Sequence, residues 1–133
     1  MEVLGNSEIL DMFDNLGVSI AVFDRDMKMI YMNEHAKWFY KTVVGAEDLL
    51  GKDVKACHAP IHVKNIQALL EEFDKRKPLN FFHTDPPMIE GGQITTLHYP
   101  YIVDGKVEGI MEINVESSLA DGGRGAYERK YSE

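Results

Sequence analysis

The sequence predicts one α+β domain, in which a five-stranded antiparallel sheet carries helices on one face. The first observation behind this prediction is the change of period along the chain. Apolar residues recur at helical spacing in some regions and at a spacing of two in others. The second is the set of capping and turn residues that separate these regions. Helical patterns precede the first strand and fill the interval between the second and third strands, so the helices are inserted into a succession of antiparallel strands.

A short helix and a hairpin open the chain. Asn6 or Ser7 can cap a helix that ends near residue 16, and its apolar residues follow helical spacing. The β-rich segments 18–23 and 28–32 predict two strands. The short Asp-containing turn between them predicts that they form a hairpin.

Two further helices follow this hairpin. Asn33 is suited to cap a helix that ends near Gly45, because its side chain can accept a hydrogen bond from a first-turn amide. The strongest helical pattern begins near Pro60 and stops before Pro78, with basic residues in its last turn where the helix dipole favours them. Its apolar stripe is formed by Val63, Ile66, Leu69, Leu70 and Phe73.

The last part of the domain has the period of strands. Residues 79–83 and 93–103 predict the third and fourth strands, and the dipeptide Asp104-Gly105 is a strong hairpin signal. Residues 107–116 alternate apolar and polar side chains, which predicts a half-buried fifth strand.

Length and composition limit the class of protein. The 133 residues, 44% of them hydrophobic, fit a single domain over residues 1–118, with residues 119–133 as a linker or flexible tail. The formal charge of -8, with 14 basic and 22 acidic residues, argues against binding of nucleic acid. No apolar run is long enough to span a bilayer, no secretory signal opens the chain, and the single Cys57 cannot form an internal disulfide. We therefore expect a cytoplasmic protein.

Three segments resemble the PAS family of sensor and interaction domains. Residues 22–33, VFDRDMKMIYMN, are similar to the PAS opening of two strands, an acidic turn and a helix-starting Asn. Residues 50–54 resemble the Gly-containing loop after the middle helices, and residues 104–109 resemble the last hairpin. The resemblance covers about residues 7–118. Residues 50–60, LGKDVKACHAP, resemble more narrowly the PAS domains of prokaryotic proteins that also carry a hemerythrin-like domain, although that subgroup has Cys-His-Pro without an intervening Ala.

This resemblance implies a strand order of 2-1-5-4-3. It also implies an interior space between sheet and helices that holds haem, flavin, a metabolite or nothing, and, in many members, dimerisation through the N-terminal helix. Pockets of this kind are mostly apolar with a few polar groups. A small apolar metabolite is therefore one expected ligand, although the same residues equally fit a closed core. The predicted lining residues are Met32, Phe39, His62, Ile66, Leu69, Leu97, Tyr99, Met111 and Ile113.

Non-covalent haem is the main alternative for the cofactor. His62 lies at the start of the long predicted helix and shares an apolar face with Ile66 and Phe73, where a neutral imidazole can ligate iron. In the haem-binding members that the sequence resembles, the histidine lies further into the helix, near Lys64 or Asn65 here. The simpler interpretation of His62 is a first-turn residue that hydrogen-bonds to backbone or water. The candidates for a second axial ligand are Met29, Met32 and Met111.

A second metal hypothesis concerns Cys57, His58 and His62, which place three thiolate or imidazole ligands for zinc or iron within a short segment. Covalent haem attachment is excluded, because the Cys-x-x-Cys-His motif lacks its first cysteine. The chain has no Gly-rich phosphate loop, no Gly-x-Ser-x-Gly elbow and no zinc-protease helix, so we expect no enzyme.

The sequence therefore predicts a PAS module for signal input or dimerisation. Three functions remain open: a sensor of a small metabolite, a haem sensor of redox state or gas, and an interaction module with a closed core. The expected partners are a small-molecule ligand, a second copy of the chain, and an attached or separate effector domain. We expect no nucleic acid and no membrane among the partners of this domain.

Overall fold

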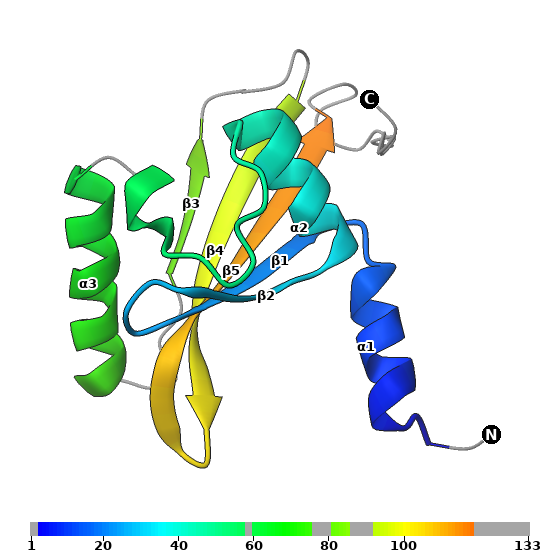
Figure 1. Ribbon diagram of the computed structural model, residues 1–133, viewed down its shortest axis with the longest axis horizontal. Coiled ribbons are helices and arrows are strands. Elements are labelled where there is room, and N and C mark those ends of the chain that lie inside the picture. The colour runs from blue at the N-terminus through cyan, green and yellow to red at the C-terminus, as the bar shows by residue number, and fades with distance from the viewer. Residues whose placement is uncertain (1–2, 58–59, 76–80, 86–91, 119–133) are drawn as a thin grey trace.

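One antiparallel sheet forms the frame of the domain (Figure 1). The computed structural model describes residues 3–57, 60–75, 81–85 and 92–118. The five strands lie in the order β2-β1-β5-β4-β3, the order that the PAS resemblance implies. Their bounds are β1 Ser19–Asp24, β2 Met29–Met32, β3 Phe81–Asp85, β4 Gly92–Val103 and β5 Lys106–Ser118.

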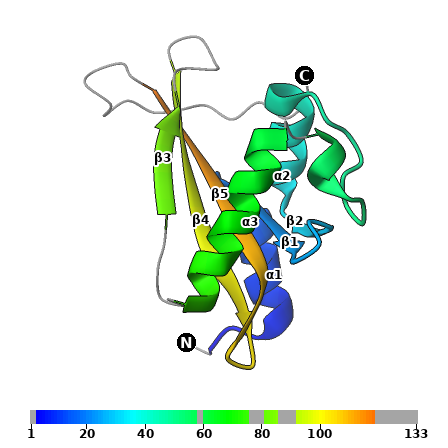
Figure 2. The same cartoon turned by 90° about the vertical axis from the view of Figure 1, so that its left-hand side faces the viewer.

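Helices cover one face of this sheet (Figure 2). After β2 the chain forms α2 and then a π-helical turn, and after a loop it forms a short 3-10 helix and the long α3. The α+β class, with an antiparallel sheet and helices, is thus confirmed. Within the described residues, no helix is both long and apolar enough to cross a membrane. The bounds are α1 Asn6–Asp14, α2 Glu34–Phe39, η1 Tyr40–Val44, η2 Val54–Cys57 and α3 Pro60–Lys75.

Several element boundaries follow the capping and turn signals, but the predicted cap of the first helix was wrong: α1 is capped by Gly5, and Asn6 and Ser7 lie inside the helix. Asn33 caps α2 as predicted, since its Oδ1 accepts a hydrogen bond from the Ala36 amide at 2.9 Å. The turn between β4 and β5 places Asp104 at φ 50° and Gly105 at φ 77°, the left-handed conformations that a two-residue hairpin turn requires. The predicted start of the third strand at residue 79 and the tail after residue 118 lie outside the described residues.

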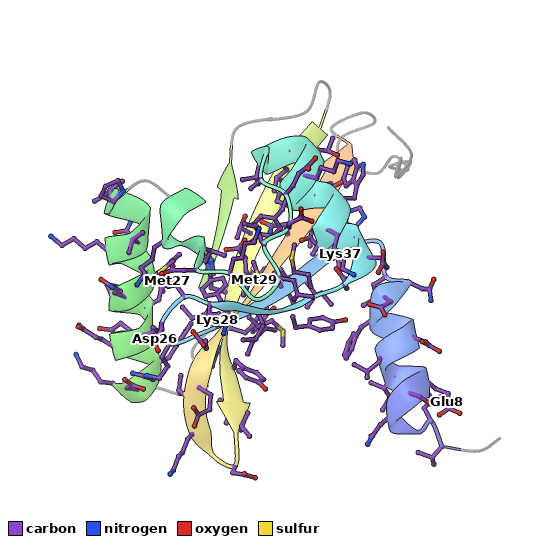
Figure 3. The ribbon with its side chains drawn as sticks, in the orientation of Figure 1. Glu8, Asp26, Met27, Lys28, Met29 and Lys37 are labelled. Carbon is purple, nitrogen blue, oxygen red and sulfur yellow. The ribbon has the colours of Figure 1, made fainter. Side chains whose placement is uncertain are left out.

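The hydrophobic core lies between the sheet and the helices. From α3 it takes Ile66, Leu70 and Phe73, which are buried members of the predicted stripe, with Val63 and Leu69 packed against them. The sheet contributes Ala21 and Phe23 from β1 and Ile110 from β5, and α2 contributes Ala36 and Phe39. In Figure 3 the buried Met27 and Met29 lie near the middle of the molecule, whereas Glu8 lies on α1 at its edge.

The first helix, α1, is attached to the domain at its C-terminal end. The Asn33 side chain donates two hydrogen bonds of 2.9 Å, to the carbonyl oxygens of Phe13 and Val18. The Tyr31 hydroxyl donates to the Asp14 carboxylate at 3.3 Å. Partial burial and the nearby Asp14 carboxylate raise the pKa of Tyr31 to about 12. No residue of α1 is buried, and its apolar residues Leu10, Met12 and Phe13 are exposed.

Strand register fixes which side chains face the helices. On β5, Ile110 belongs to the core and Glu112 reaches Tyr40 of η1, so the even-numbered residues from Ile110 to Glu116 face the helices. Met111 and Ile113 alternate with them and therefore face away. Residues directly opposite each other on paired strands share a face, so Leu97 (opposite Ile113) and Tyr99 (opposite Met111) also lie on the outer face.

Candidate functional site

A row of polar side chains crosses the inner face of the sheet, under the helices. Asn114 and Glu116 of β5 are buried, and Glu112 of the same strand is partly buried. On the neighbouring β4, Thr96 and His98 are buried on the same face. A buried polar group is costly unless it is hydrogen-bonded, so the contacts of this row determine whether it is stable.

One contact of this row joins α2 to the end of β5. His35 Nε2 lies 2.8 Å from Glu116 Oε1, with side-chain exposures of 0% and 2%. His35 follows the Asn33 cap by two residues, so the start of α2 sets its position. The imidazole also packs against Trp38, with ring centroids 5.1 Å apart. The position of α2 is therefore tied to a strand residue two positions before the end of β5.

A second contact joins η1 to the middle of β5, with Glu112 at its centre. The Tyr40 hydroxyl donates to Glu112 Oε1 at 2.5 Å, and Asn114 Nδ2 donates to the same oxygen at 3.1 Å. His98 Nε2 lies 3.1 Å from the other oxygen, Glu112 Oε2. The Asn114 side chain in turn accepts a hydrogen bond of 2.7 Å from Thr96. These contacts connect η1, β5 and β4 into one buried network.

The Glu112 carboxylate is held in its charged form. Burial alone raises the pKa of this carboxyl, but the hydrogen bonds from its partners and the charge of His98 outweigh burial. Together they lower the pKa of Glu112 from 4.5 to about 2. The network therefore contains a fixed negative charge at the middle of the sheet.

Two polar atoms on the same inner face have no hydrogen-bond partner among the described residues. They are Glu116 Oε2 and Ser19 Oγ, both buried. Ser19 of β1 is directly opposite Asn114 of β5, two residues before Glu116. A carboxylate oxygen and a hydroxyl in this position have unused capacity for a ligand or water that offers a hydrogen-bond donor.

The structure divides the predicted pocket residues between two faces. Met32, Phe39 and Ile66 are buried on the helix side and Leu69 packs against the same core, so these four border the interior, and their role in a pocket stays a prediction. Leu97, Tyr99, Met111 and Ile113 lie on the outer face instead, where they cannot line a space between sheet and helices. The assignment of these four residues to the interior pocket was wrong, because the alternation on β4 and β5 places polar residues inside.

The predicted metal ligands cannot be placed as a site. His62 falls in the first turn of α3, and Cys57 ends η2, but the side chains of both lie outside what the structure describes, as does residue 58. Met111, a candidate second axial ligand, faces away from the helices. In the described part of the chain, no group of three or more His, Cys, Asp or Glu side chains could hold a metal ion. Haem or metal binding at these residues stays a prediction.

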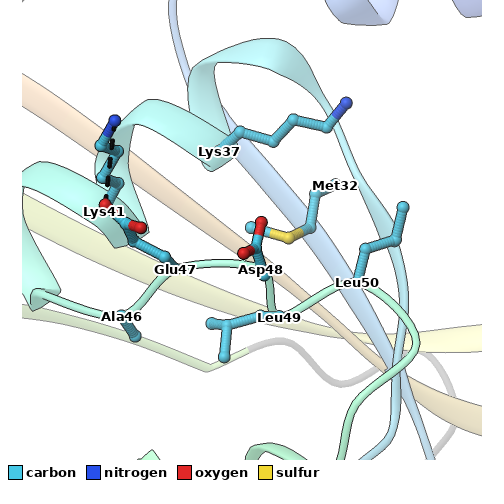
Figure 4. Close-up of a pocket in the computed structure, with 8 residues that line it drawn as sticks. All are labelled: Met32, Lys37, Lys41, Ala46, Glu47, Asp48, Leu49 and Leu50. Atoms are coloured by element: carbon cyan, nitrogen blue, oxygen red, sulfur yellow. Dashed lines mark ion pairs between the residues drawn. The ribbon is translucent and has the colours of Figure 1, made fainter.

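An open cavity lies at the edge of the core, between β2, the α2–η1 segment and residues 46–50 (Figure 4). Its volume is about 380 Å³, which is in the range of small-molecule sites. We call it the β2–η1 cavity. Of the eight predicted pocket residues whose side chains the structure describes, only Met32 lines it. Its lining residues are Met32, Lys37, Lys41, Ala46, Glu47, Asp48, Leu49 and Leu50.

Sequence reasoning missed the residues of the buried network. His35, Glu112 and Glu116 lie on predicted elements, but their polar side chains suggest solvent exposure. The aromatic ring of Tyr40 fits the apolar face of its predicted helix, and only the contact of its hydroxyl with Glu112 was missed. One signal was present in the sequence: Thr96 and His98 share a parity on one strand, as Glu112, Asn114 and Glu116 do on the next. Polar residues of one parity on two neighbouring strands indicate a polar face, which pairing can bury.

The strand order, with helices inserted between β2 and β3, defines a PAS-type α+β domain. The chain matches the PAS fold family model over residues 13–118, and this protein therefore belongs to that family. No protein of curated function matches the chain in sequence.

Several solved structures share this fold. A C-terminal domain from Streptococcus mutans has a TM-score of 0.67 at 14% identity, covering 85% of this chain and 89% of that chain. The PAS domain of BvgS from Bordetella pertussis has a TM-score of 0.60 at 16% identity, covering 86% of this chain and 87% of that chain. A PAS domain from Colwellia psychrerythraea gives 0.59 at 19% identity, covering 84% and 96%. At such identities the likeness concerns the fold alone.

Proposed function

We propose that this domain is a sensory input module. A small ligand or a protein partner binds one arrangement of helices and sheet better than another, and the shift in population changes the segments that flank the domain. The effector is an attached domain or a separate partner protein. We assign no catalytic role to the domain.

One observation carries this proposal: two buried polar contacts tie the α2–η1 segment to β5. His35 of α2 meets Glu116 and Tyr40 of η1 meets Glu112, so both helices of the segment are linked to a single strand. Because β5 runs to Ser118, a movement of the helices that shifts this strand can also shift the residues that follow it. The name of one structural relative agrees with a sensory role, since it is a PAS domain of the histidine kinase ThkA.

The interior network also bears on the kind of ligand. The centre of the inner face presents a carboxylate, an amide and an imidazole, together with the unpartnered Glu116 Oε2 and Ser19 Oγ. A ligand that enters this space must supply hydrogen bonds, because contact with an apolar group would leave these atoms desolvated without partners. We therefore favour a small polar ligand over the apolar metabolite or haem that the sequence suggests.

Hydrogen-exchange mass spectrometry on a variant of the helix–strand link tests the relay. Tyr40→Phe keeps the ring and removes only the hydroxyl that reaches Glu112. We expect faster exchange both in residues 40–44 and in residues 112–118. The matched control is Tyr101→Phe on the half-buried end of β4. A change that stays within η1, or an equal change in the control, would contradict the relay.

We also propose that the domain forms a homodimer through α1. The helix exposes Leu10 at 53%, Met12 at 46% and Phe13 at 36%. Its attachment through Asn33 at the C-terminal end leaves these side chains exposed to a second copy. Sedimentation equilibrium tests the proposal: Leu10→Glu should dissociate the dimer, whereas Asp11→Lys, a charge change at the neighbouring exposed position, should not. A wild-type protein that stays monomeric at high concentration would rule out this role for α1.

A further inference from the structure

The β2–η1 cavity combines an apolar floor with a charged rim. Met32 and Leu49 are only 7% and 8% exposed, so they form the deep part of the lining. The side chains of Lys37, Lys41 and Glu47 are 50%, 66% and 64% exposed, so they lie at the mouth. Such a cavity suits a ligand with one apolar end and one charged end.

The charges at the rim balance each other. Lys37 and Lys41 lie one helical turn apart at the junction of α2 and η1, and Glu47 and Asp48 lie across from them on the loop (Figure 4). The carboxylates of Glu47 and Asp48 would repel a ligand with net negative charge, and the two lysines would repel one with net positive charge. A ligand that carries both charges and is neutral overall satisfies both sides.

The rim charges are available to a ligand. Lys37 pairs with Glu34 at 3.0 Å and Lys41 pairs with Glu47 at 3.8 Å, and all four side chains are at least half exposed. Exposed pairs of this kind contribute little to stability, so a ligand carboxylate can replace them. The Asp48 carboxylate has no hydrogen bond or ion pair with any residue that the structure describes, which leaves it free to accept from an ammonium group.

We propose that the β2–η1 cavity binds a small zwitterion with an aliphatic side chain, of the chemistry of an aliphatic α-amino acid. The ligand carboxylate contacts Lys41, and its ammonium group contacts Asp48. The side chain packs on Met32 and Leu49. This inference goes beyond the proposed relay, because binding at the cavity is measured directly and does not require the buried network to transmit anything.

Titrations followed by two-dimensional NMR test the proposal. The probes are L-leucine, L-isoleucine, L-valine and L-methionine, each added up to about 10 mM, which saturates most of a site with millimolar affinity. Two analogues of leucine each lack one charge: 4-methylpentanoate has no ammonium group and 3-methylbutylamine has no carboxylate. We expect saturable shifts that cluster at residues 32, 37, 41 and 46–50, and affinities at least about tenfold weaker for both analogues.

Matched variants localise the binding. Asp48→Asn keeps the shape of the side chain and suits the positive φ of 54° at this position, so its fold should be preserved. It should weaken binding of the amino acid at least about tenfold, as should Lys41→Gln. Asp104→Asn is the control, because Asp104 is also an exposed aspartate with positive φ, at 50°, but lies in the β4–β5 turn.

Three results would overturn the proposal. One is the absence of saturable shifts with all four amino acids. Another is equal binding of 4-methylpentanoate, which would make the cavity an anion site. The third is clustering of the shifts on the inner face of the sheet. If the amino acids bind as expected while Tyr40→Phe leaves hydrogen exchange in β5 unchanged, then binding at the β2–η1 cavity is confirmed. Only the proposed relay to β5 is then contradicted.

Discussion

The His35 imidazole and the Glu116 carboxylate meet at 2.8 Å in a part of the domain that water does not reach. The two residues are 81 positions apart in the sequence, one at the start of α2 and the other near the end of β5. Their contact depends on the whole sheet, because β5 lies beside β1 only when the last hairpin has joined the first.

Removing one partner of this contact should destabilise the domain strongly. His35→Ala leaves the Glu116 carboxylate buried without its partner, and we expect a loss of about 3–5 kcal/mol in the free energy of unfolding. Urea unfolding of His35→Ala, Glu116→Ala and the double variant measures the coupling. The double variant should lose less than the sum of the single losses.

The control for this cycle is the exposed pair of Glu34 and Lys37 on the same helix. Lys37→Ala should cost less than about 0.5 kcal/mol. If the losses at His35 and Glu116 are additive, or as small as at Lys37, the buried contact is not an energetic link.

Stability should depend on pH through Glu112. The pKa of this carboxyl is lowered to about 2 in the folded protein, whereas an unfolded chain has an ordinary pKa near 4.5. A lowered pKa stabilises the fold above the unfolded pKa, and this contribution is lost as pH falls from about 4.5 to about 2. The shift corresponds to roughly 3 kcal/mol.

Urea unfolding at several pH values checks this prediction by comparison with Glu112→Gln. The free energy of unfolding of the wild-type protein should exceed that of the variant most above pH 5, and this difference should shrink as pH falls to about 2. A difference that is constant over this range would show that Glu112 has an ordinary pKa in the folded state.

Asn33 should control the attachment of α1. Its Oδ1 accepts from the Ala36 and Ile20 amides, and its Nδ2 donates to the Phe13 and Val18 carbonyl oxygens. Asn33→Asp keeps the acceptors but places a carboxylate against two carbonyl oxygens. We expect a loss of about 2–4 kcal/mol in stability, since two buried hydrogen bonds are removed.

The release of α1 can be followed by hydrogen exchange of residues 6–14. In Asn33→Asp, exchange in α1 should rise more than exchange in α2, because the helix cap survives. Equal increases in the two helices would mean that the substitution unfolds the domain as a whole.

Gly109 should be intolerant of any side chain. It lies opposite Asp24 on β1, and a Cβ atom at this position would come within 2.1 Å of the Phe23 carbonyl oxygen. Gly109→Ala should therefore separate β1 from β5 and cost about 3 kcal/mol or more. Gly105→Asn is the control, because Gly105 has open space around it and Asn tolerates its φ of 77°. Thermal unfolding separates the two outcomes, and similar melting temperatures would contradict the close approach.

The fold could be predicted from local signals. The Asn33 cap, the turn at Asp104 and Gly105 and the stripe that contains Ile66 and Phe73 each depend on neighbouring residues, and the structure confirms all of them. The π-helical form of residues 40–44 could not be predicted, because the spacing of their apolar residues fits an ordinary helix as well.

The candidate site could be predicted only in part, for a physical reason. Alternation on β5 predicts a strand with two different faces but does not say which face the helices cover. Met111 and Ile113 were placed inside because apolar residues usually are. Glu112 and Glu116 lie inside instead, because Tyr40 and His35 bind them there. These partners are 72 and 81 residues away in the sequence. Pairing over such distances leaves no local pattern.

The alternation of β5 also limits how this strand can move. A slip of one residue against β1 and β4 would place Met111, Ile113 and Val115 under the helices and turn the carboxylates of Glu112 and Glu116 outward. Every buried polar contact of the strand would then be broken at once. A one-residue slip is therefore unfavourable, and a movement of β5 that keeps these contacts is a bend or tilt of the strand in fixed register.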